Sequence, residues 1–165
     1  MRDYFLTLAR HNAWANTRLF KACLALTEAD YRAQRGAFFG SIHGTLNHLL
    51  VADRTWMARL TGGDAGIDRL DTILYDDRQA LWAARQAQDA AAIAFVEALA
   101  PIRLGEILEY RTFRGTPQRT PIPLVVGHMF NHATHHRGQV HGLLSQVPTD
   151  PPPLDLLYFT RGEPA

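Results

Sequence analysis

The feature that most constrains this chain is a histidine-rich stretch near its end. Residues 128–139 read HMFNHATHHRGQ and contain four of the eight histidines of the sequence. Pro121 and Pro123 precede an apolar run at residues 124–126, where a helix is expected to begin, and Pro148 lies beyond its expected end. The stretch therefore predicts a long helix that carries an unusual number of imidazoles through its middle.

Two of these histidines lie one helical turn apart on the face that is expected to meet the core. At about 100° per residue, positions three or four apart share a face of a helix. One stripe then contains Val125, Met129, His132, His136, Gln139 and Leu143. His132 and His136 have the spacing with which one helix offers two imidazoles to a single metal ion. Two core histidines that hydrogen-bond through water would give the same pattern, so this helix alone leaves both interpretations open.

Length, charge and cysteine content exclude several classes of protein. A chain of 165 residues is most simply one domain, residues 1–165, and can bury a core without disulfides. The formal net charge of +1 argues against nucleic-acid binding. Cys23 is the single cysteine, which excludes a disulfide framework and fits a reducing compartment. We see no leader and no apolar run of membrane length, and so expect a cytoplasmic protein without a membrane partner.

Two amphipathic helices are expected in the first 60 residues. Apolar residues recur at helical intervals from Asp3 to Leu26, with no proline or glycine between them. Thr27 begins an acidic, polar segment that continues through Asp30, and Gly36 with Gly40 marks a loop. Ser41 is a suitable N-cap for a second helix that extends to about Leu60.

A third helix and a short hairpin are expected before the histidine-rich helix. The third helix runs from about residue 76 to residue 99, and we expect its charges, such as Arg78, Arg85 and Asp89, to form a solvated face. Residues 107–113 alternate weakly, 114–117 read as a turn, and 118–122 complete a hairpin. The apolar segment 154–159 is expected to dock on the surface. Four long helices with one longer connection predict an all-α four-helix bundle.

A histidine on the second helix is the natural third ligand of a metal site. Helix bundles build such sites in their core from side chains on facing helices, and His48 lies toward the edge of the apolar face of the second helix. Two histidines from one helix and one from another leave a coordination position open, which is typical of catalytic zinc sites. The all-imidazole set suits zinc, nickel, iron(II) or copper. We expect one divalent ion per chain, zinc or nickel before iron or manganese.

Three further polar residues are candidates for a supporting role, and the catalytic residues themselves remain open. Asp53 falls within an apolar stripe, where its carboxylate needs an arginine, a tyrosine or a ligating histidine as partner; an ordinary buried ion pair also explains it. His128 lies one turn before His132 and has an unperturbed pKa near neutrality, which suits a proton carrier. Gln139 lies on the stripe beyond His136. For all three, structural packing is the alternative.

Four segments in order carry a family resemblance. They are Asn12–Leu19, Ser41–Leu50 with Asp53 and Trp56, Asn131–His132 followed by His136–Gln139, and Pro152–Leu156. Through them the sequence resembles the DinB/YfiT-like family over almost its whole length. The resemblance implies an up-down-down-up bundle, usually a homodimer, with a divalent metal ion held by the histidine triad that corresponds to His48, His132 and His136.

The resemblance also implies a class of chemistry. Family members with assigned activities are thiol-dependent S-transferases, which use bacillithiol-like thiols, and mycothiol-dependent isomerases; others are described as damage- or stress-inducible. A metal ion lowers the pKa of bound water from about 15.7 to roughly 7, or holds a thiol as its thiolate. We therefore expect a metal-dependent S-transferase or hydrolase acting on a small electrophile, with a low-molecular-weight thiol as co-substrate. The alternative is a non-catalytic metal-binding dimer of the stress response.

Overall fold

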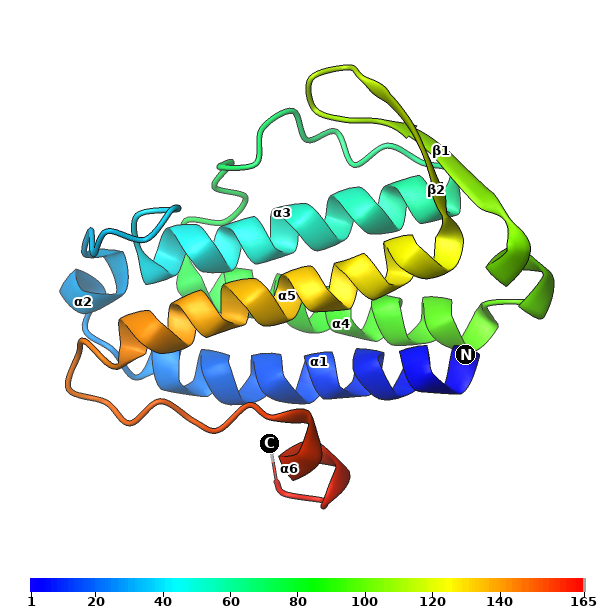
Figure 1. Ribbon diagram of the computed structural model, residues 1–165. Helices are drawn as coiled ribbons and strands as arrows, with labels where there is room; N and C mark the ends of the chain where they lie inside the picture. The colour runs from blue at the N-terminus through cyan, green and yellow to red at the C-terminus, as the bar shows by residue number, and fades with distance from the viewer. Residues whose placement is uncertain (165) are drawn as a thin grey trace.

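Four long helices form the body of the computed structural model, which describes residues 1–164 (Figure 1). They are α1 (Arg2–Leu24), α3 (Ile42–Thr61), α4 (Arg78–Ala98) and α5 (Ile122–Leu144). Helices α1 and α5 run in one direction, and α3 and α4 run in the other (Figure 1). Both α1 and α3 pack against α4 and α5. The predicted all-α bundle with up-down-down-up order is confirmed.

Local capping explains where the helices begin and end. The side chain of Ser41 accepts a hydrogen bond from the amide of Gly44 at 3.0 Å, as expected for the N-cap of α3. Gly62 ends α3 with a φ of 76°, a left-handed conformation that glycine adopts without strain. Asp77 caps α4 by accepting from the amide of Ala80 at 2.7 Å. These caps agree with the predicted limits of both helices to within two residues.

Four short elements complete the chain. They are α2 (Glu28–Arg32), η1 (Pro101–Gly105), α6 (Leu156–Thr160) and the hairpin of β1 (Ile107–Arg111) and β2 (Pro117–Pro121). The hairpin is antiparallel, with Ile107 opposite Pro121, and lies at one end of the bundle as predicted (Figure 1). The polar segment that begins at Thr27 contains a helical turn that was not expected, and Thr27 caps it by accepting from the amide of Asp30 at 3.1 Å. No described helix is both long and apolar enough to cross a membrane.

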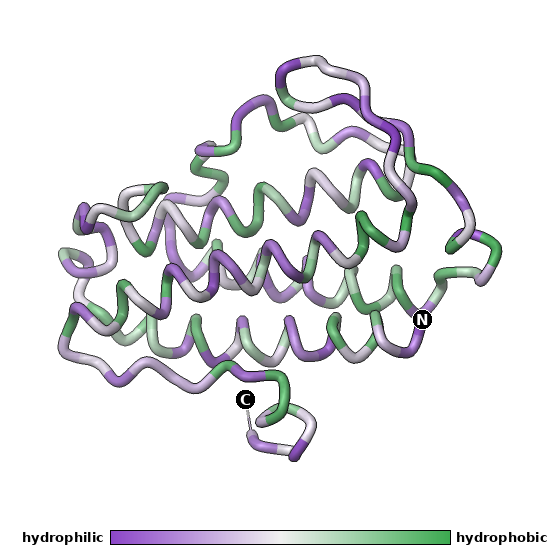
Figure 2. Tube along the Cα trace, in the orientation of Figure 1, coloured by the Kyte–Doolittle hydropathy of each residue, from purple (hydrophilic) through white to green (hydrophobic). Residues whose placement is uncertain are grey.

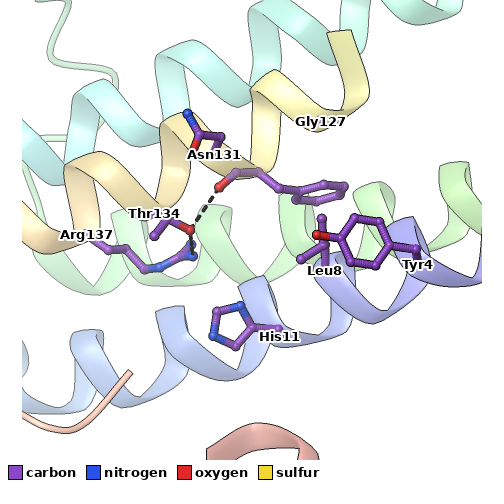
Figure 3. Close-up of a pocket in the computed structure, with 8 residues that line it drawn as sticks. Tyr4, Leu8, His11, Gly127, Asn131, Thr134 and Arg137 are labelled. Carbon is purple, nitrogen blue, oxygen red and sulfur yellow. Dashed lines mark hydrogen bonds between the residues drawn. The ribbon is translucent and has the colours of Figure 1, made fainter. Parts of the chain in front are cut away.

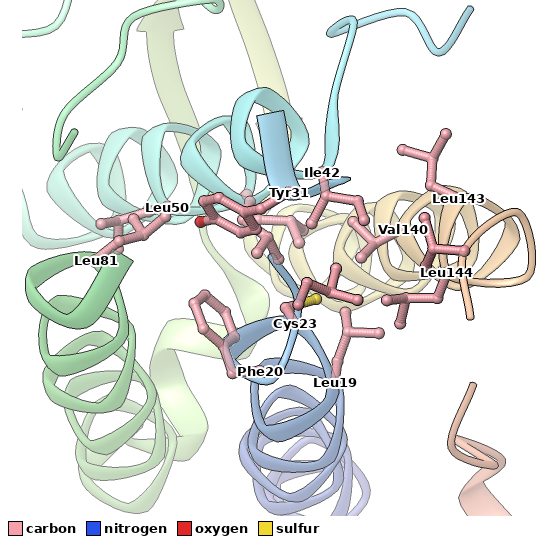
Figure 4. Close-up of a cluster of buried hydrophobic side chains, with 14 of the residues drawn as sticks. Leu19, Phe20, Cys23, Tyr31, Ile42, Leu50, Leu81, Val140, Leu143 and Leu144 are labelled. Atoms are coloured by element: carbon pink, nitrogen blue, oxygen red, sulfur yellow. The ribbon is translucent and has the colours of Figure 1, made fainter. Parts of the chain in front are cut away.

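The core consists of two apolar clusters along the bundle. Apolar and polar residues alternate along each long helix, so that each contributes one apolar stripe (Figure 2). The first cluster surrounds Cys23 and is drawn in Figure 4. Burial raises the pKa of the Cys23 thiol to about 12, as expected for a buried cysteine that packs as a small apolar residue. The second cluster, around Val96 and Val126, lies toward the hairpin.

Two connections bring loop residues against the helices. The connection 62–77 returns the chain along the bundle from the end of α3 to the beginning of α4, which the parallel order of these helices requires (Figure 1). The C-terminal segment docks on α1, as expected for its apolar residues: Phe159 contacts His11 and Trp14, with ring centroids 5.9 Å from each. Trp14 Nε1 donates to the carbonyl of Glu163 at 2.9 Å.

Candidate metal centre

Helices α3 and α5 bring three histidines to one point inside the bundle. On α5, the Nε2 atoms of His132 and His136 lie 3.1 Å apart, one turn from each other. The ring of His48 on α3 lies 4.4 Å from that of His136 and 5.3 Å from that of His132, between centroids. One nitrogen from each ring lies within 4.8 Å of the other two. The residues that the sequence places 84 and 88 positions apart thus converge across one helix–helix interface.

Hydrogen bonds made by Nδ1 orient two of the imidazoles, those of His48 and His136. His48 Nδ1 donates to the carbonyl of Leu70 at 2.8 Å, and His136 Nδ1 donates to Oε1 of Gln139 at 2.7 Å. With the protons on Nδ1, Nε2 of each ring carries the lone pair; that of His136 lies 3.1 Å from His132 Nε2. His48 Nε2 is buried and has no hydrogen-bond partner among the described residues. A buried polar atom without a partner is costly, unless a ligand satisfies it.

Burial keeps these imidazoles neutral at physiological pH. Burial lowers the pKa of His48 to about 4, although the hydrogen bond to Leu70 opposes the shift. The pKa of His132 falls to about 3, first through burial and then through the neighbouring imidazoles. Burial also lowers the pKa of His136. Because only the neutral imidazole has a lone pair to donate, all three side chains are in the ligating form near pH 7.

The donor set fits a divalent transition-metal ion. Nitrogen–metal distances of about 2.0–2.1 Å in a tetrahedral site place ligand nitrogens roughly 3.4 Å apart. The 3.1 Å between the Nε2 atoms of His132 and His136 is close to that separation. Neutral imidazoles suit zinc, nickel or iron(II), and histidines that bind a metal ion usually donate the proton of the other ring nitrogen to an acceptor, as His48 and His136 do here. Three protein ligands leave a coordination position open.

Two loop residues that sequence analysis did not identify as part of the site contact the histidines of the triad. Phe39 stacks on His48, with centroids 3.7 Å apart and planes at 16°, and meets the edge of His136 at 5.6 Å. Leu70 supplies the carbonyl that holds His48. Phe39 lies in a glycine-flanked loop and Leu70 in a long connection, so neither belongs to a periodic pattern that would indicate a buried role.

A cavity of about 330 Å³ opens on the His132 side of the triad. Its walls come from α3, α5, the 62–77 connection and the hairpin. They are formed by Ala52, Thr55, Trp56, Arg59, Leu70, Tyr110, Thr112, Phe113, His128 and His132. We call this space the aromatic cavity. A second cavity, of about 690 Å³, lies beyond Phe39 and also touches Leu70. Of these two cavities, the aromatic cavity is the one whose described lining includes a member of the triad, His132.

The three supporting candidates occupy different places. The exposed ring of His128 lies at the aromatic cavity, 5.5 Å from that of His132, and partial desolvation lowers its pKa. Gln139 hydrogen-bonds His136 directly. Asp53 instead forms an ion pair with Arg85 at 2.8 Å. Its partner is therefore an arginine, not a tyrosine or a ligating histidine. Leu70 and Gln139, not Asp53, accept the ring protons of the two aimed histidines.

The prediction that Arg78, Arg85 and Asp89 form a solvated face of the third helix is wrong for Arg85 and Asp89. Arg85 is 1% exposed and Asp89 is 5% exposed, and they form an ion pair at 2.9 Å. They lie on one stripe of α4 with Leu81, Ala92 and Val96, all buried. This spacing could have revealed their position, but two charges within an apolar stripe require buried partners that the sequence of one helix cannot show.

A groove between α1 and α5 is a weaker candidate site (Figure 3). Its volume is about 230 Å³, and Tyr4 and Leu8 form its apolar side. Its two charged or titratable nitrogen-bearing side chains already have partners: Arg137 donates to Thr134 Oγ1 at 3.0 Å, and His11 Nε2 lies 2.8 Å from the carbonyl of Leu154. This groove therefore does not present a cluster of converging imidazole nitrogens like that of the triad.

Replacing Gln139 with alanine is expected to weaken zinc binding by about 10–100-fold, the usual effect of losing the partner of a ligating histidine. The change removes the acceptor of the His136 Nδ1 proton, so the ring loses its orientation. Competition with a chromophoric chelator measures the Kd. Gln139→Glu, which keeps an acceptor, should retain affinity, and Gln146→Ala on an exposed residue serves as control. Equal affinities of Gln139→Ala and wild type would contradict the role of Gln139.

The sequence of this chain is similar to a known family and to a known protein. A family model described as "DinB family" matches residues 1–164. The protein named "Protein DinB" of Bacillus subtilis (strain 168) is 24% identical over 184 aligned residues, which cover all of both chains. No solved structure matched this chain.

Proposed function

This chain belongs to the DinB family, and we propose that it is a metal-dependent enzyme in which His48, His132 and His136 hold one divalent ion beside a substrate cavity. The observation that carries the proposal is the convergence of three neutral imidazoles, one of them with a buried Nε2 that lacks a partner. Buried polar atoms are usually hydrogen-bonded in folded proteins, and a bound metal ion would satisfy His48 Nε2. Zinc and nickel suit this donor set best.

The bound ion would supply Lewis acidity, which either holds a low-molecular-weight thiol as its thiolate or lowers the pKa of a water molecule. The protein's own groups do the rest. Leu70 and Gln139 keep the ring protons on Nδ1, and Phe39 covers His48 against water. His128, at the aromatic cavity, is the group placed to take a proton from the nucleophile.

We favour thiol transfer over hydrolysis. The aromatic cavity is lined mainly by apolar and aromatic side chains, which suit an organic electrophile. The thiol sulfur would attack an electrophilic carbon of this substrate, a bond from that carbon to its leaving group would break, and the thiol proton would pass to His128 or to solvent. The family resemblance points the same way. In hydrolysis, water takes the place of the thiol in an otherwise identical arrangement.

Zinc-loaded protein is expected to conjugate a small thiol to an activated aryl halide with saturable kinetics in both reactants. Release of the chromogenic product measures the rate, with 2-mercaptoethanol and 1-chloro-2,4-dinitrobenzene as the first pair. Chelation should abolish the enzymatic rate, and zinc or nickel should restore it. Product formation that needs metal but not thiol would identify a hydrolase.

The result that would overturn an enzymatic role is equally clear. If the protein binds one metal ion per chain but accelerates neither conjugation nor hydrolysis of a panel of electrophiles, the alternative of a non-catalytic metal-binding protein is favoured. If it binds no metal, the proposal of a metal-dependent function fails altogether.

A further inference from the structure

The guanidinium of Arg59 occupies an unusual setting in the aromatic cavity. Its central carbon lies 4.7 Å from the ring centroid of Trp56, 4.9 Å from that of Tyr110 and 5.6 Å from that of Phe113. One of its amino groups donates to the carbonyl of Arg111 at 2.9 Å. Three aromatic faces and one neutral acceptor hold this cation in place, but none of them carries a negative charge.

Two other arginines toward this end of the bundle have a carboxylate partner. Arg103 pairs with Glu106 at 2.8 Å and Arg119 pairs with Glu109 at 3.0 Å. No carboxylate of the described residues forms an ion pair with Arg59, although Asp64 and Asp68 line an adjacent cavity that Arg59 also borders. Desolvation lowers the pKa of Arg59, which measures the cost of its partial burial. A guanidinium that is desolvated without a counter-charge is a site for an anion.

Arg59 and His132, a member of the triad, line the same cavity. The aromatic cavity contains no acidic residue, and Arg59 is the one arginine or lysine among the described residues that line it. His132 lines this cavity from α5, while Arg59 lines it from α3. On α3, Arg59 follows His48 by eleven residues, about 16 Å along the helix axis. The cation and the metal site therefore lie toward different ends of the cavity.

We propose that Arg59 is a specificity-determining residue that binds the carboxylate of an elongated small substrate whose apolar body lies against Trp56, Tyr110 and Phe113. The guanidinium donates two parallel hydrogen bonds to the carboxylate, a geometry that a neutral amide cannot match. The reacting group of the ligand then lies beside His132. This last step rests on the proposed function; the binding of the carboxylate by Arg59 does not.

The first test measures binding to metal-free protein, where no ion can attract the carboxylate. The probes are 3-phenylpropionate and its amide, which have the same body and differ in charge. Fluorescence of Trp56 reports binding, with Trp56→Phe as the check that this tryptophan gives the signal. Wild type should bind the acid more tightly than the amide by at least about tenfold, which corresponds to roughly 1.4 kcal/mol.

Substitutions of Arg59 test whether this residue causes the preference for the acid over the amide. Arg59→Gln should remove the preference for the acid, Arg59→Lys should retain part of it, and Arg119→Gln, which removes an exposed charge on the hairpin, should leave it unchanged. Zinc affinity should be equal in all four proteins. Loss of preference with unchanged zinc binding supports the proposal. A wild type without preference, or an Arg59→Gln variant that keeps it, would overturn the proposal whether or not zinc binds.

Two matched pairs identify which reactant carries the carboxylate. One compares 3-mercaptopropionate with 2-mercaptoethanol, and the other compares 4-chloro-3-nitrobenzoate with its amide. The pair whose preference disappears in Arg59→Gln is the one that Arg59 recognises, measured as Kd by fluorescence and, with zinc, as KM. If neither preference depends on Arg59, the assignment is wrong. Because the Kd is measured without turnover, failure of the enzymatic proposal remains distinguishable from failure of this one.

Discussion

Replacing His132 with alanine is expected to abolish stoichiometric metal binding while the bundle stays folded. Structural zinc sites in zinc-finger peptides bind with apparent free energies of about 10–16 kcal/mol near neutral pH. If three imidazoles contribute equally on that scale, loss of one costs about 3–5 kcal/mol, on the order of 10³-fold in Kd. Elemental analysis of protein purified without chelator should find about one first-row metal ion per wild-type chain and none in the variant.

Of the three proposed ligands, His132 suits this test best because its ring is only partly buried and its Nδ1 has no hydrogen bond to another described residue. The matched control is His141→Ala, which removes a histidine from the same helix but outside the triad. Zinc at about 100 times its Kd should stabilise wild type and the control by roughly 2.7 kcal/mol and should not stabilise the variant. Folded wild type that neither contains metal nor binds zinc or nickel would refute the site.

Replacing Asp89 with alanine is expected to cost about 3–5 kcal/mol of unfolding free energy, as is usual when one partner of a buried ion pair is lost. Asp89 pairs with Arg85 at 2.9 Å and accepts hydrogen bonds from the side-chain amides of Asn12 at 3.0 Å and Asn16 at 2.9 Å. The variant leaves a buried guanidinium with one carboxylate, Asp53, and two amides without their acceptor. Chemical denaturation measures the loss.

The expected size of that loss follows from the charge balance of a buried network. Two carboxylates, Asp53 and Asp89, neutralise Arg85 and Arg137, and all four side chains are buried. Burial lowers the pKa of Arg137 only to about 10, so it stays charged at pH 7. Asp89→Asn should therefore also destabilise the protein, since it leaves a net positive charge in the core.

A surface pair provides the control for the network. Glu109→Ala breaks the pair with Arg119, in which both side chains are about 70% exposed, and should leave the denaturation midpoint nearly unchanged. If Asp89→Ala unfolds at the same denaturant concentration as wild type, the network does not stabilise the fold.

This network also bears on the metal centre. Arg137 follows His136 in the chain, and its guanidinium donates to Asn12 on α1 and to Thr134 on α5. Asp53 lies five residues after His48 on α3 and reaches Arg85 on α4. The network therefore joins all four long helices and sets the rotation about their axes. That rotation determines where the imidazoles of α3 and α5 point.

Several elements were predictable because their signals are local. The spacing of His132 and His136 fixes which face they share once α5 forms, and Ser41 with Gly62 marks the ends of α3 through backbone chemistry that needs no distant partner. The five-residue α2 was missed because one capped turn has too few residues to show a period. The solvated face was assigned wrongly because helical spacing identifies a stripe but does not tell which charges find buried partners.

The sequence by itself determined the four long helices, the hairpin and the histidines that the bundle could bring together, since these depend on periodicity, caps and residue type. Only the tertiary structure decided that Leu70 and Gln139 orient the imidazoles, that Phe39 covers His48, and that Arg59 enters an aromatic cavity without a counter-ion. The physical reason is that these contacts join segments far apart in the chain or depend on side-chain geometry. Their energies exist only after the helices have packed.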